Sequence, residues 1–416
     1  MSSTREKTVT SFERLYGDDA GQRQRYKRIS DEFTAMFSHE PNRYFSASGR
    51  TEVGGNHTDH NHGLVMAAAV NLDVIAAVRA TDSSVVTVKS EGFDADIVDI
   101  SDLSVVDSEK NHSASLIRGV CAGLKERGYR IGGFEAYTTS SVLKGSGLSS
   151  SAAFEVLIGT IVNHLYNDGR ISAVEIAQVA QYAENKYFGK PSGLMDQMAS
   201  SVGGFISIDF EDTSKPVIEA IDFDPAEHGC CLCIIDTKGS HAELTPEYAA
   251  IPSEMKAVAG FFGKEYLRQI TKKDVLDNIN EIRKKTGDRA VLRALHFFDE
   301  NERVHRLSAA LKRGDFDAFL SCINESGLSS YRYLQNVYPS SMPREQSVSL
   351  ALYLCERLLG GEGACRVHGG GFAGTIQAFV PIGRLDSLKS GMERVFGEGS
   401  CYVLSIRPVG GTEVTL

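Results

Sequence analysis

The chain has 416 residues, of which 42% are hydrophobic and 24% charged, a balance typical of globular proteins that excludes extensive disorder. Its length favours two or three domains over one. The formal net charge of −10 argues against a nucleic-acid or anionic-membrane partner, because such binding depends on clustered Lys and Arg.

The cysteines and the apolar runs indicate where the protein works. Eight cysteines lie along the chain without the dense spacing of a small secreted scaffold. Cys230, Cys231 and Cys233 fall in a run typical of a buried strand, with a metal site as the alternative. No stretch approaches the roughly 20 apolar residues of a membrane span, and the first residues lack an apolar signal core. We therefore expect a cytoplasmic protein with free thiols.

The first half of the chain alternates between helical and strand patterns. Apolar spacing predicts a helix over about 10–38. Short β-branched runs separated by turn residues then predict an antiparallel meander of three strands, at 73–79, 85–89 and 95–100. Further on we expect a helix at 112–127, a strand at 133–139, a helix at 152–166 and a helix that begins with the capping box Ser172–Glu175.

Gly203 and Gly204 interrupt this pattern, and a different arrangement follows. We expect strands at 205–210, 231–235, 378–380 and 401–406, several helices within 245–360, and a helix at 384–396. The fold class is therefore mixed α+β with a break near residue 203, which divides the chain into domains 1–203 and 204–416.

A glycine- and serine-rich segment, 143–153, lies between a predicted strand and a predicted helix. Gly145 and Gly147 allow the backbone to approach a phosphate closely. Ser149, Ser150 and Ser151 open the helix, where hydroxyls, amide N–H groups and the helix dipole favour an anion. The segment lacks the Gly-Lys-Ser/Thr ending of a P-loop, so a plain connector is the alternative.

A second polar segment, Gly49 to Gly63, precedes an apolar run. Three interpretations compete for its Asp, Asn and His residues. The set His57, Asp59, His60 and His62 contains metal-ligand types, but their spacing matches neither a helix nor a paired knuckle. The same residue types suit adjacent sugar hydroxyls, because they present short, fixed donors and acceptors. A solvated polar loop is the third interpretation.

Three segments, in order, resemble the three motifs of the GHMP kinase superfamily, and more narrowly those of galactokinases. The galactokinase signature reads roughly G-R-V-N-L-I-G-E-H-T-D-Y-N-x-G, and residues 49–63 fit its frame. Residues 143–152 resemble the phosphate motif P-x-G-x-G-L-S-S-S-A, and residues 369–374 resemble G-G-G-F-G-G. The resemblance implies an N-terminal domain like ribosomal protein S5 domain 2, a ferredoxin-like C-terminal domain, and an active site between them.

The resemblance also implies an activity: transfer of the γ-phosphate of ATP to the anomeric C1 hydroxyl of a galactose-like sugar, with Mg²⁺ as cofactor. Asp196 takes the place of the catalytic aspartate and Arg50 that of the catalytic arginine. The resemblance implies that the sugar is contacted by Asn56, His57, Asp59, Gly193 and Tyr248. It also implies that the nucleotide phosphates are bound by Gly145, Ser146, Gly147, Leu148, Ser149, Ser150, Ser151 and Ala152. Glu184 aligns with the acidic Mg²⁺ ligand, beside Ser150 and Ser151.

Three of these residues also have ordinary structural interpretations. Asp196 is equally suited to cap the helix that follows it, Glu184 to a solvated helix end, and Tyr248 to the core. Phosphoryl transfer nevertheless asks for positioning, a cation, metal ligands and a carboxylate near the nucleophile, and each of these has a candidate in the chain.

One departure from the signature bears on specificity. Asn56 stands where galactokinases usually have Glu, a residue that touches the 6-hydroxyl of the sugar. Asn is neutral and both donates and accepts hydrogen bonds. We therefore hypothesise that Asn56 weakens discrimination at C6, so that 6-deoxy and 6-oxidised sugars are tolerated.

Two other functions compete with a galactokinase. One is a kinase of the same family for N-acetylgalactosamine, arabinose or galacturonate. The other is a galactose- and ATP-binding regulator without catalysis, a kind of protein that lacks residues of the Ser-Ser-Ser-Ala stretch. Here Ser149 to Ala152, Arg50 and Asp196 are all present, which favours the enzyme. The expected partners are a small sugar and ATP, while the sequence leaves the oligomeric state open.

Overall fold

The computed structural model of the chain describes all residues except 1–8, 17–18, 143–146, 191, 240–243 and 373. Within this part the strands are β1 (Val9–Ser11), β2 (Arg43–Gly54), β3 (Leu64–Ala80), β4 (Val85–Ser90), β5 (Ala95–Asp99), β6 (Phe134–Ser140), β7 (Phe205–Asp209), β8 (Val217–Ile221), β9 (Cys230–Asp236), β10 (Ala364–His368), β11 (Thr375–Pro381), β12 (Cys401–Leu404) and β13 (Thr412–Thr415).

The α-helices are α1 (Phe12–Tyr16), α2 (Ala20–Phe37), α3 (Ser113–Glu126), α4 (Ser150–Tyr166), α5 (Ala173–Tyr182), α6 (Met195–Val202), α7 (Thr245–Phe261), α8 (Lys272–Asp277), α9 (Ile279–Thr286), α10 (Asp288–Lys312), α11 (Phe316–Ser329), α12 (Ser347–Leu359) and α13 (Leu385–Phe396). The π-helices η3 (Ala183–Phe188) and η6 (Ser330–Leu334) and the 3₁₀ turn η1 (Asp59–Asn61) also bear on the site.

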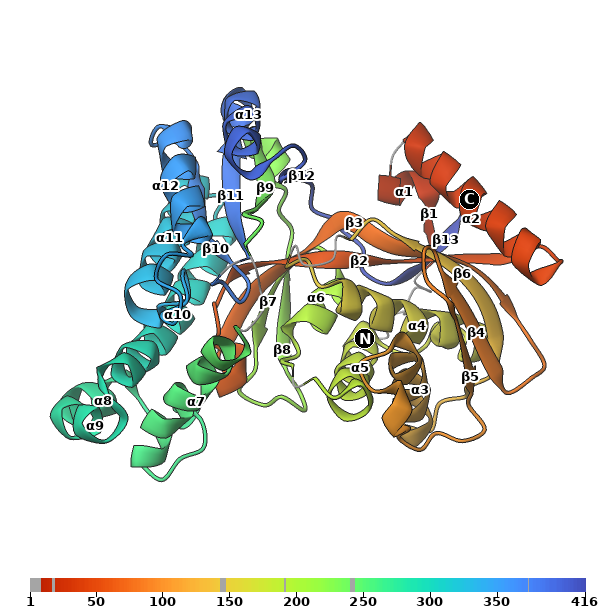
Figure 1. Ribbon diagram of the computed structural model, residues 1–416, viewed down its shortest axis with the longest axis horizontal. Coiled ribbons are helices and arrows are strands. Elements are labelled where there is room, and N and C mark those ends of the chain that lie inside the picture. Colours follow the sequence, from red (N-terminus) through yellow and green to blue (C-terminus); the bar gives the residue numbers. More distant parts are fainter. Residues whose placement is uncertain (1–8, 17–18, 143–146, 191, 240–243, 373) are drawn as a thin grey trace.

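The first sheet is built around the long strand β3, which runs with β2 through the middle of the molecule (Figure 1). The strand order is β1-β13-β2-β3-β6-β4-β5, with β7 and β8 on the other half of β3. Residues 64–68 of β3 pair with β7, and residues 74–80 pair with β6. β3 reads as a nearly continuous apolar run because most of it is buried on both faces.

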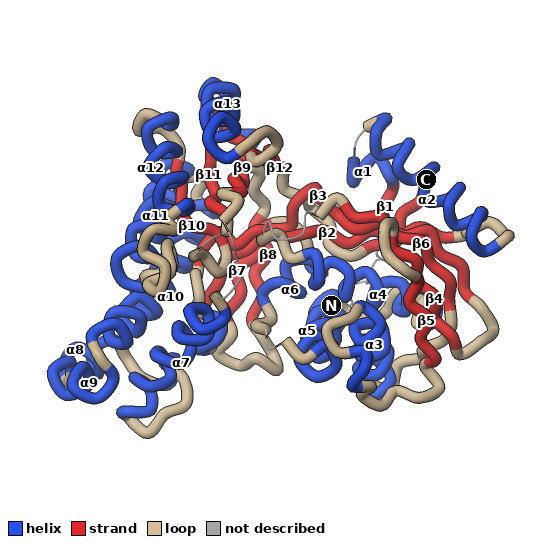
Figure 2. The backbone as a smooth tube through the Cα atoms, viewed as in Figure 1, coloured by secondary structure: helices blue, strands red, loops and turns tan. Residues whose placement is uncertain are grey.

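Helices cover both faces of this sheet, with α3 to α6 on one side and α2 on the other (Figure 2). α4 is apolar almost all round, and its buried residues join the main hydrophobic core. Its first residue, Ser150, therefore lies at a fixed place where the helix emerges from the core, close to β2.

The second sheet has the antiparallel order β10-β11-β9-β12 and packs against α12 and α13. Helices α7, α9 and α10 form a further apolar cluster that includes Phe372. Residues 369–371, between β10 and β11, lie beside residues 52–57 at the end of β2, because Asn56 and His57 bond to the carbonyls of Gly369 and Gly370. The glycine segment of the second sheet thus meets the polar segment of the first.

The mixed α+β class is confirmed, and so is the capping box at Ser172 and Glu175. Two predictions are wrong in detail. The helix predicted over 10–38 is β1, α1 and α2, and α2 begins at the N-cap Asp19. The predicted meander is interrupted, because β6 inserts between β3 and β4 and runs parallel to β4. Only β4 and β5 form the expected antiparallel pair.

The boundary near residue 203 stays a prediction, although β7, β8 and β13 lie beyond it and belong to the first sheet. All eight cysteines are free thiols in the structure, seven of them buried. Among the described helices, none combines the length and the apolar character needed to cross a membrane.

Candidate active site

Arg50 and Asp196 form a bidentate ion pair between β2 and the first turn of α6. Arg50 Nε donates to Asp196 Oδ1 at 2.7 Å, and Nη2 donates to Oδ2 at 2.7 Å. Burial alone would raise the pKa of Asp196, but the guanidinium outweighs it and holds the pKa below its usual range. The Asp196 side chain is 28% exposed and faces solvent, whereas the Arg50 side chain is only 8% exposed.

The alternative in which Asp196 caps its own helix does not fit the structure. The N-cap of α6 is Leu194, and no side chain caps this helix end within the described residues. Asp196 is occupied instead by Arg50 and by Ser149, whose Oγ donates to Asp196 Oδ2 at 2.6 Å. The aspartate is therefore joined to the start of α4.

The start of α4 lies beside this ion pair. The first four N–H groups of a helix have no partner inside it, and no described side chain caps them here. Gly147 and Ser149 have φ angles of 72° and 59°, and the carbonyl of Gly147 accepts a hydrogen bond from Arg50. Gly145 and Ser146 lie outside the described residues. Leu148 is fully buried, and its carbonyl accepts a hydrogen bond from the N–H of Arg50 at 3.1 Å.

Glu184 lies on η3 and is only 2% exposed, which is inconsistent with a solvated helix end. Its Oε1 accepts hydrogen bonds from Lys190 Nζ at 2.9 Å and Ser151 Oγ at 3.3 Å. Its Oε2 accepts from Gln197 Nε2 at 2.8 Å. Hydroxyl and carboxylate oxygens are the donors that Mg²⁺ prefers beside phosphates and water, so Ser150, Ser151 and Glu184 fit this ion.

A second buried carboxyl, Glu155, lies behind Glu184 and was not found from the sequence. Gln197 Nε2 bridges the two, donating to Glu155 Oε2 at 3.1 Å as well as to Glu184. Burial and the nearby charge of Glu184 raise the pKa of Glu155 well above its usual range. Glu155 Oε1 and Gln197 Oε1 are buried and have no partner within the described residues.

The polar segment after β2 turns toward the same ion pair. Asp59 begins η1, and a Cβ placed on Gly193 would lie 1.9 Å from Asp59 Oδ2, so the Gly193 backbone rests against this carboxylate. His57 has a φ of 58° and donates from Nε2 to the carbonyl of Gly370 at 3.2 Å. Burial lowers the pKa of His57 to about 3, which keeps the ring neutral.

Tyr248 approaches the same glycine segment from α7. Its hydroxyl donates to the carbonyl of Gly371 at 3.1 Å, and its ring packs edge-on against Phe372 at a centroid distance of 5.0 Å. A Cβ on Gly370 would lie 2.7 Å from the Tyr248 ring. Tyr248 is thus partly a core residue and partly a wall of the polar segment.

Asn56 is the candidate that the structure places least favourably for a sugar contact. Its side chain is fully buried, and Nδ2 donates to Glu52 Oε1 and to the carbonyl of Gly369, both at 2.8 Å. Its Oδ1 accepts from Asn336 Nδ2 at 2.8 Å and from Ser330 Oγ at 3.2 Å. An amide makes about four hydrogen bonds at most, so all are in use. A direct contact with a sugar stays a prediction, and this network counts against it.

The metal interpretation of the histidine segment finds no support. Within the described residues, no group of three or more His, Cys, Asp or Glu side chains is arranged to hold a metal ion, whether here or at the cysteine run of β9. His62 instead stacks on Tyr266 at 3.9 Å, and His60 lies 3.6 Å from the carboxylate of Asp59.

A cavity of about 460 Å³ lies beside the start of α4. Ser150 and Ser151 contribute to its lining, and the rest of the surface is mainly apolar, with Phe93, Leu116 and Phe154 among the lining residues. Its size and lining suit a flat aromatic ligand whose charged tail reaches the helix end. No sequence pattern predicted this cavity, because its walls come from β4, β6, α3 and α4 together.

The fold and this site define a class of protein. Residues 115–204 match the family described as the GHMP kinases N terminal domain. Among solved structures, the chain is similar to a Lactococcus lactis galactokinase complexed with galactose, with a TM-score of 0.78 and 23% identity, covering 93% of this chain and 99% of that one. It is also similar to the mevalonate kinase of Methanococcus jannaschii, with a TM-score of 0.60 and 13% identity over 88% and 98% of the two chains. The fold is that of the GHMP kinases.

Sequence relatives narrow the class. The chain is 31% identical over 373 residues to a galactokinase of Streptomyces coelicolor, covering 88% of this chain and 92% of the relative. It is 30% identical over 362 residues to a galactokinase of Actinobacillus pleuropneumoniae, covering 86% and 91%. Residues 31–80 match the galactokinase galactose-binding signature. The chain belongs to the galactokinase family, and the predicted family, fold class and enzyme class are confirmed.

Proposed function

We propose that this protein transfers the γ-phosphate of ATP to the C1 hydroxyl of galactose, giving galactose 1-phosphate and ADP. The observation that carries the proposal is the ion pair of Arg50 and Asp196 at the start of α4, with bonds of 2.7 Å. It brings a cation, a carboxylate and a helix N-terminus to one point, which is the set that phosphoryl transfer requires.

Asp196 orients the C1 hydroxyl and accepts its proton. Because Arg50 keeps the pKa of Asp196 low, this carboxylate is a weak base, suited to a late proton transfer in a loose transition state. Arg50, which also bonds to Gly147, neutralises charge on the transferred phosphoryl group. The helix N-terminus at Ser150 holds the remaining phosphates.

Galactose lies between the ion pair and the glycine segment in this proposal. Asp59 accepts from ring hydroxyls, and its carboxylate rests on Gly193. His57 and Tyr248 hold the opposite end of the sugar ring. There His57 contacts the carbonyl of Gly370, and Tyr248 contacts the carbonyl of Gly371. The cavity beside Ser150 and Ser151 takes the adenine of ATP.

Mg²⁺ is proposed as the cofactor, held by Ser150, Ser151 and Glu184. When bound, the ion neutralises phosphate charge. Lys190, which is bonded to Glu184 at 2.9 Å, lies close enough to contact either the carboxylate or a phosphate. We also propose a cytoplasmic location, which the eight free thiols support.

The test is ADP release with ATP and Mg²⁺ over a panel of galactose, N-acetylgalactosamine, arabinose, fucose and galacturonate. We expect the highest kcat/KM with galactose. A preference of tenfold or more for another sugar would move the assignment within the family. Binding of galactose and ATP without ADP release from any sugar would instead favour the regulator.

A further inference from the structure

The candidate sugar contacts fall into two groups along the cleft. Near Arg50 and Asp196 lie Asp59 and Gly193. At the other end, Asn56, His57 and Tyr248 contact the carbonyls of three successive glycines, 369, 370 and 371. In the proposed function, a pyranose whose C1 hydroxyl lies at Asp196 would direct its opposite side, which carries C4 and C6, toward this second group. We call residues 56–57 and 369–371 the glycine wall.

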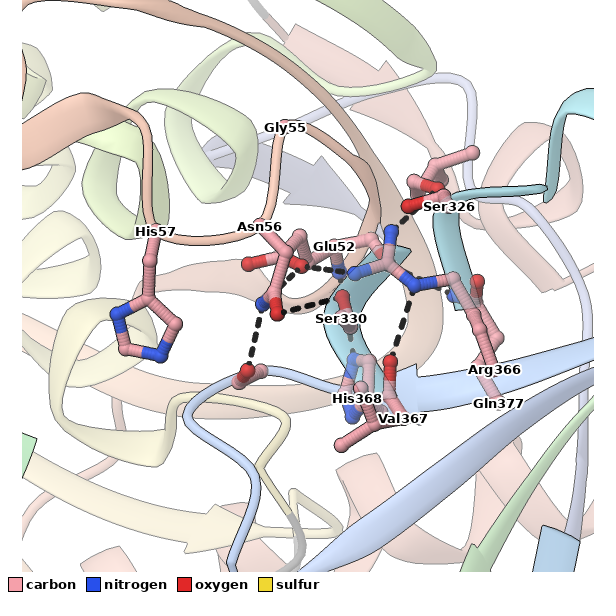
Figure 3. Close-up of polar contacts among 12 residues, drawn as sticks. Glu52, Gly55, Asn56, His57, Ser326, Ser330, Arg366, Val367, His368 and Gln377 are labelled. Carbon is pink, nitrogen blue, oxygen red and sulfur yellow. Dashed lines mark hydrogen bonds and ion pairs between the residues drawn. The ribbon is translucent and has the colours of Figure 1, made fainter. Parts of the chain in front are cut away.

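The glycine wall and the end of β2 together contain an exchange of residue types relative to the galactokinase signature. The signature has Asn and, four residues later, Glu, whereas this chain has Glu52 and, four residues later, Asn56. The two side chains are in contact, since Asn56 Nδ2 donates to Glu52 Oε1 at 2.8 Å (Figure 3). The chain therefore retains one carboxylate and one amide, but the carboxylate lies on the strand instead of in the loop.

The position of the carboxylate is explained by a buried arginine on β10. Arg366 is fully buried and donates from Nη2 to Glu52 Oε1 at 2.8 Å. Its other nitrogens donate to the carbonyls of Val53 at 2.9 Å and Val367 at 3.0 Å. A guanidinium keeps its proton in proteins, and a buried charge needs a partner. Glu52 supplies that partner at 4% exposure.

Glu52 is also held through its backbone. Its N–H donates to His368 Nε2 at 3.3 Å, and its carbonyl accepts from Gln377 Nε2 at 2.9 Å. Figure 3 shows Arg366, His368 and Gln377 gathered on one side of Glu52, with Asn56 on the other and His57 pointing away. The negative charge is thus enclosed behind the amide, and the glycine wall presents carbonyl oxygens and a histidine that burial keeps neutral.

We propose that the exchanged pair Glu52 and Asn56 determines specificity at the C6 end of the sugar, by withdrawing the carboxylate to Arg366 and leaving an uncharged wall. This inference rests on the proposed function and deepens it. An acid at position 56 would repel an anionic substituent on C6, whereas an acid at position 52 is neutralised by Arg366. The substrate class is therefore galactose-like sugars in which C6 carries a hydroxyl, no oxygen or a carboxylate.

The experiment is a double-mutant cycle that moves the carboxylate. Glu52→Asn leaves Arg366 without a counter-charge, and Asn56→Glu places two carboxylates together, so each single variant should lose kcat/KM on galactose and stability to urea. The double variant E52N/N56E should recover most of both. Relative to wild type, its kcat/KM ratio for galacturonate over galactose should fall about tenfold or more, as expected for a like charge beside the substrate.

Two further variants serve as controls for this interpretation. E52Q/N56D moves the same charge without changing the shape of either side chain, and it should lower the galacturonate ratio even if E52N/N56E folds poorly. Glu362→Asn removes the acid of the exposed pair Arg384–Glu362, which has nearly the same length, 2.7 Å, and it should change neither readout.

Two results would overturn the inference: losses in the double variant that equal the sum of the single losses, or a galacturonate ratio that is unchanged in both exchanged variants. Failure of the wild type to release ADP with galactose would instead reject the proposed function. The double-mutant cycle measured by urea denaturation distinguishes the two failures, because it measures the coupling free energy between residues 52 and 56 without any substrate.

Discussion

Two buried arginine–carboxylate pairs each have one member on β2, and they differ in the exposure of their carboxylates. Arg50 and Asp196 are 8% and 28% exposed, while Arg366 and Glu52 are 0% and 5% exposed. Arg50 holds the pKa of Asp196 below its usual range, whereas burial raises the pKa of Glu52 although Arg366 and Arg50 oppose it. The bond lengths are nearly equal, so the two pairs differ mainly in the exposure of the carboxylate, and we expect the more exposed pair to be the reactive one.

The largest effect on activity is expected at the open pair. Asp196→Asn keeps the shape of the side chain but removes the group that accepts the proton of the sugar, so kcat should fall by about 10²–10⁴-fold. Binding of ATP and galactose, measured by calorimetry, should change little. Near-normal turnover would show that Asp196 is not the base.

The largest effect on folding is expected at the enclosed pair. Arg366→Met leaves the Glu52 carboxylate buried without its counter-charge, which should lower the free energy of unfolding by about 3–5 kcal/mol. Urea denaturation measures this loss. Arg384→Met, in the exposed pair with Glu362, is the matched control and should change little. Equal losses in the two variants would remove the distinction between enclosed and exposed pairs.

A smaller effect on substrate binding is expected where Gly193 meets Asp59. Gly193→Ala places a methyl group 1.9 Å from the Asp59 carboxylate oxygen and must displace it, so KM for galactose should rise about tenfold, the equivalent of one good hydrogen bond. Steady-state kinetics measures this, with kcat less affected. Gly260→Ala, in α7 with open space around it, is the control. An unchanged KM would place the sugar away from Asp59.

The two carboxyls joined by Gln197 are both buried but differ in what they contact, because only Glu184 reaches Ser151 and Lys190. Glu184→Gln should raise the Mg²⁺ concentration required for half-maximal activity, because this carboxylate contacts Ser151 at the start of α4.

Glu155→Gln should keep the free energy of unfolding within about 1 kcal/mol, because a neutral amide replaces a carboxyl whose pKa is already well raised. A large loss in Glu155→Gln would indicate that Glu155 is ionised.

The sequence predicted which site segments come together more closely than it predicted the strands around them. Arg50, Asp196, Ser149 and Glu184 lie in segments whose residue types and spacing resemble known motifs, and the structure brings these segments together. The strand β2, which carries Arg50, was not predicted. Its buried positions include Ser46, Ser48 and Glu52, which pair with partners more than twenty residues away, so no local pattern reveals a strand.

The features that the sequence missed depend on contacts between distant segments. Glu155 reads as one polar residue in an apolar helix, and only Gln197 and Glu184 show why it is buried. The strand β6 inserts between β3 and β4, which adjacent strand patterns cannot show. Asn56 was expected in contact with the sugar, and its four hydrogen-bond partners come from three separate parts of the chain.

The smallest expected effect concerns a third pair that is neither open nor enclosed. Glu413 on β13 accepts from Arg43 at 2.6 Å and lies 3.1 Å from His164 Nδ1. Burial opposes ionisation, but His164 and Arg43 outweigh it and lower the pKa of Glu413 from 4.5 to about 2. A carboxyl whose pKa is lower in the folded than in the unfolded state stabilises the fold at pH values above its unfolded pKa. This stabilisation is lost as the pH falls from about 4.5 to about 2.

Glu413→Gln should therefore be less stable than wild type at pH 7, and the difference should narrow as the pH falls through this window. Urea denaturation at several pH values measures it, with Glu356→Gln on the exposed face of α12 as the control. A difference that stays constant down to the lowest pH would show that Glu413 acts through its shape and hydrogen bonds. A narrowing difference would show that even a half-buried pair, which joins β13 to β2, contributes through charge.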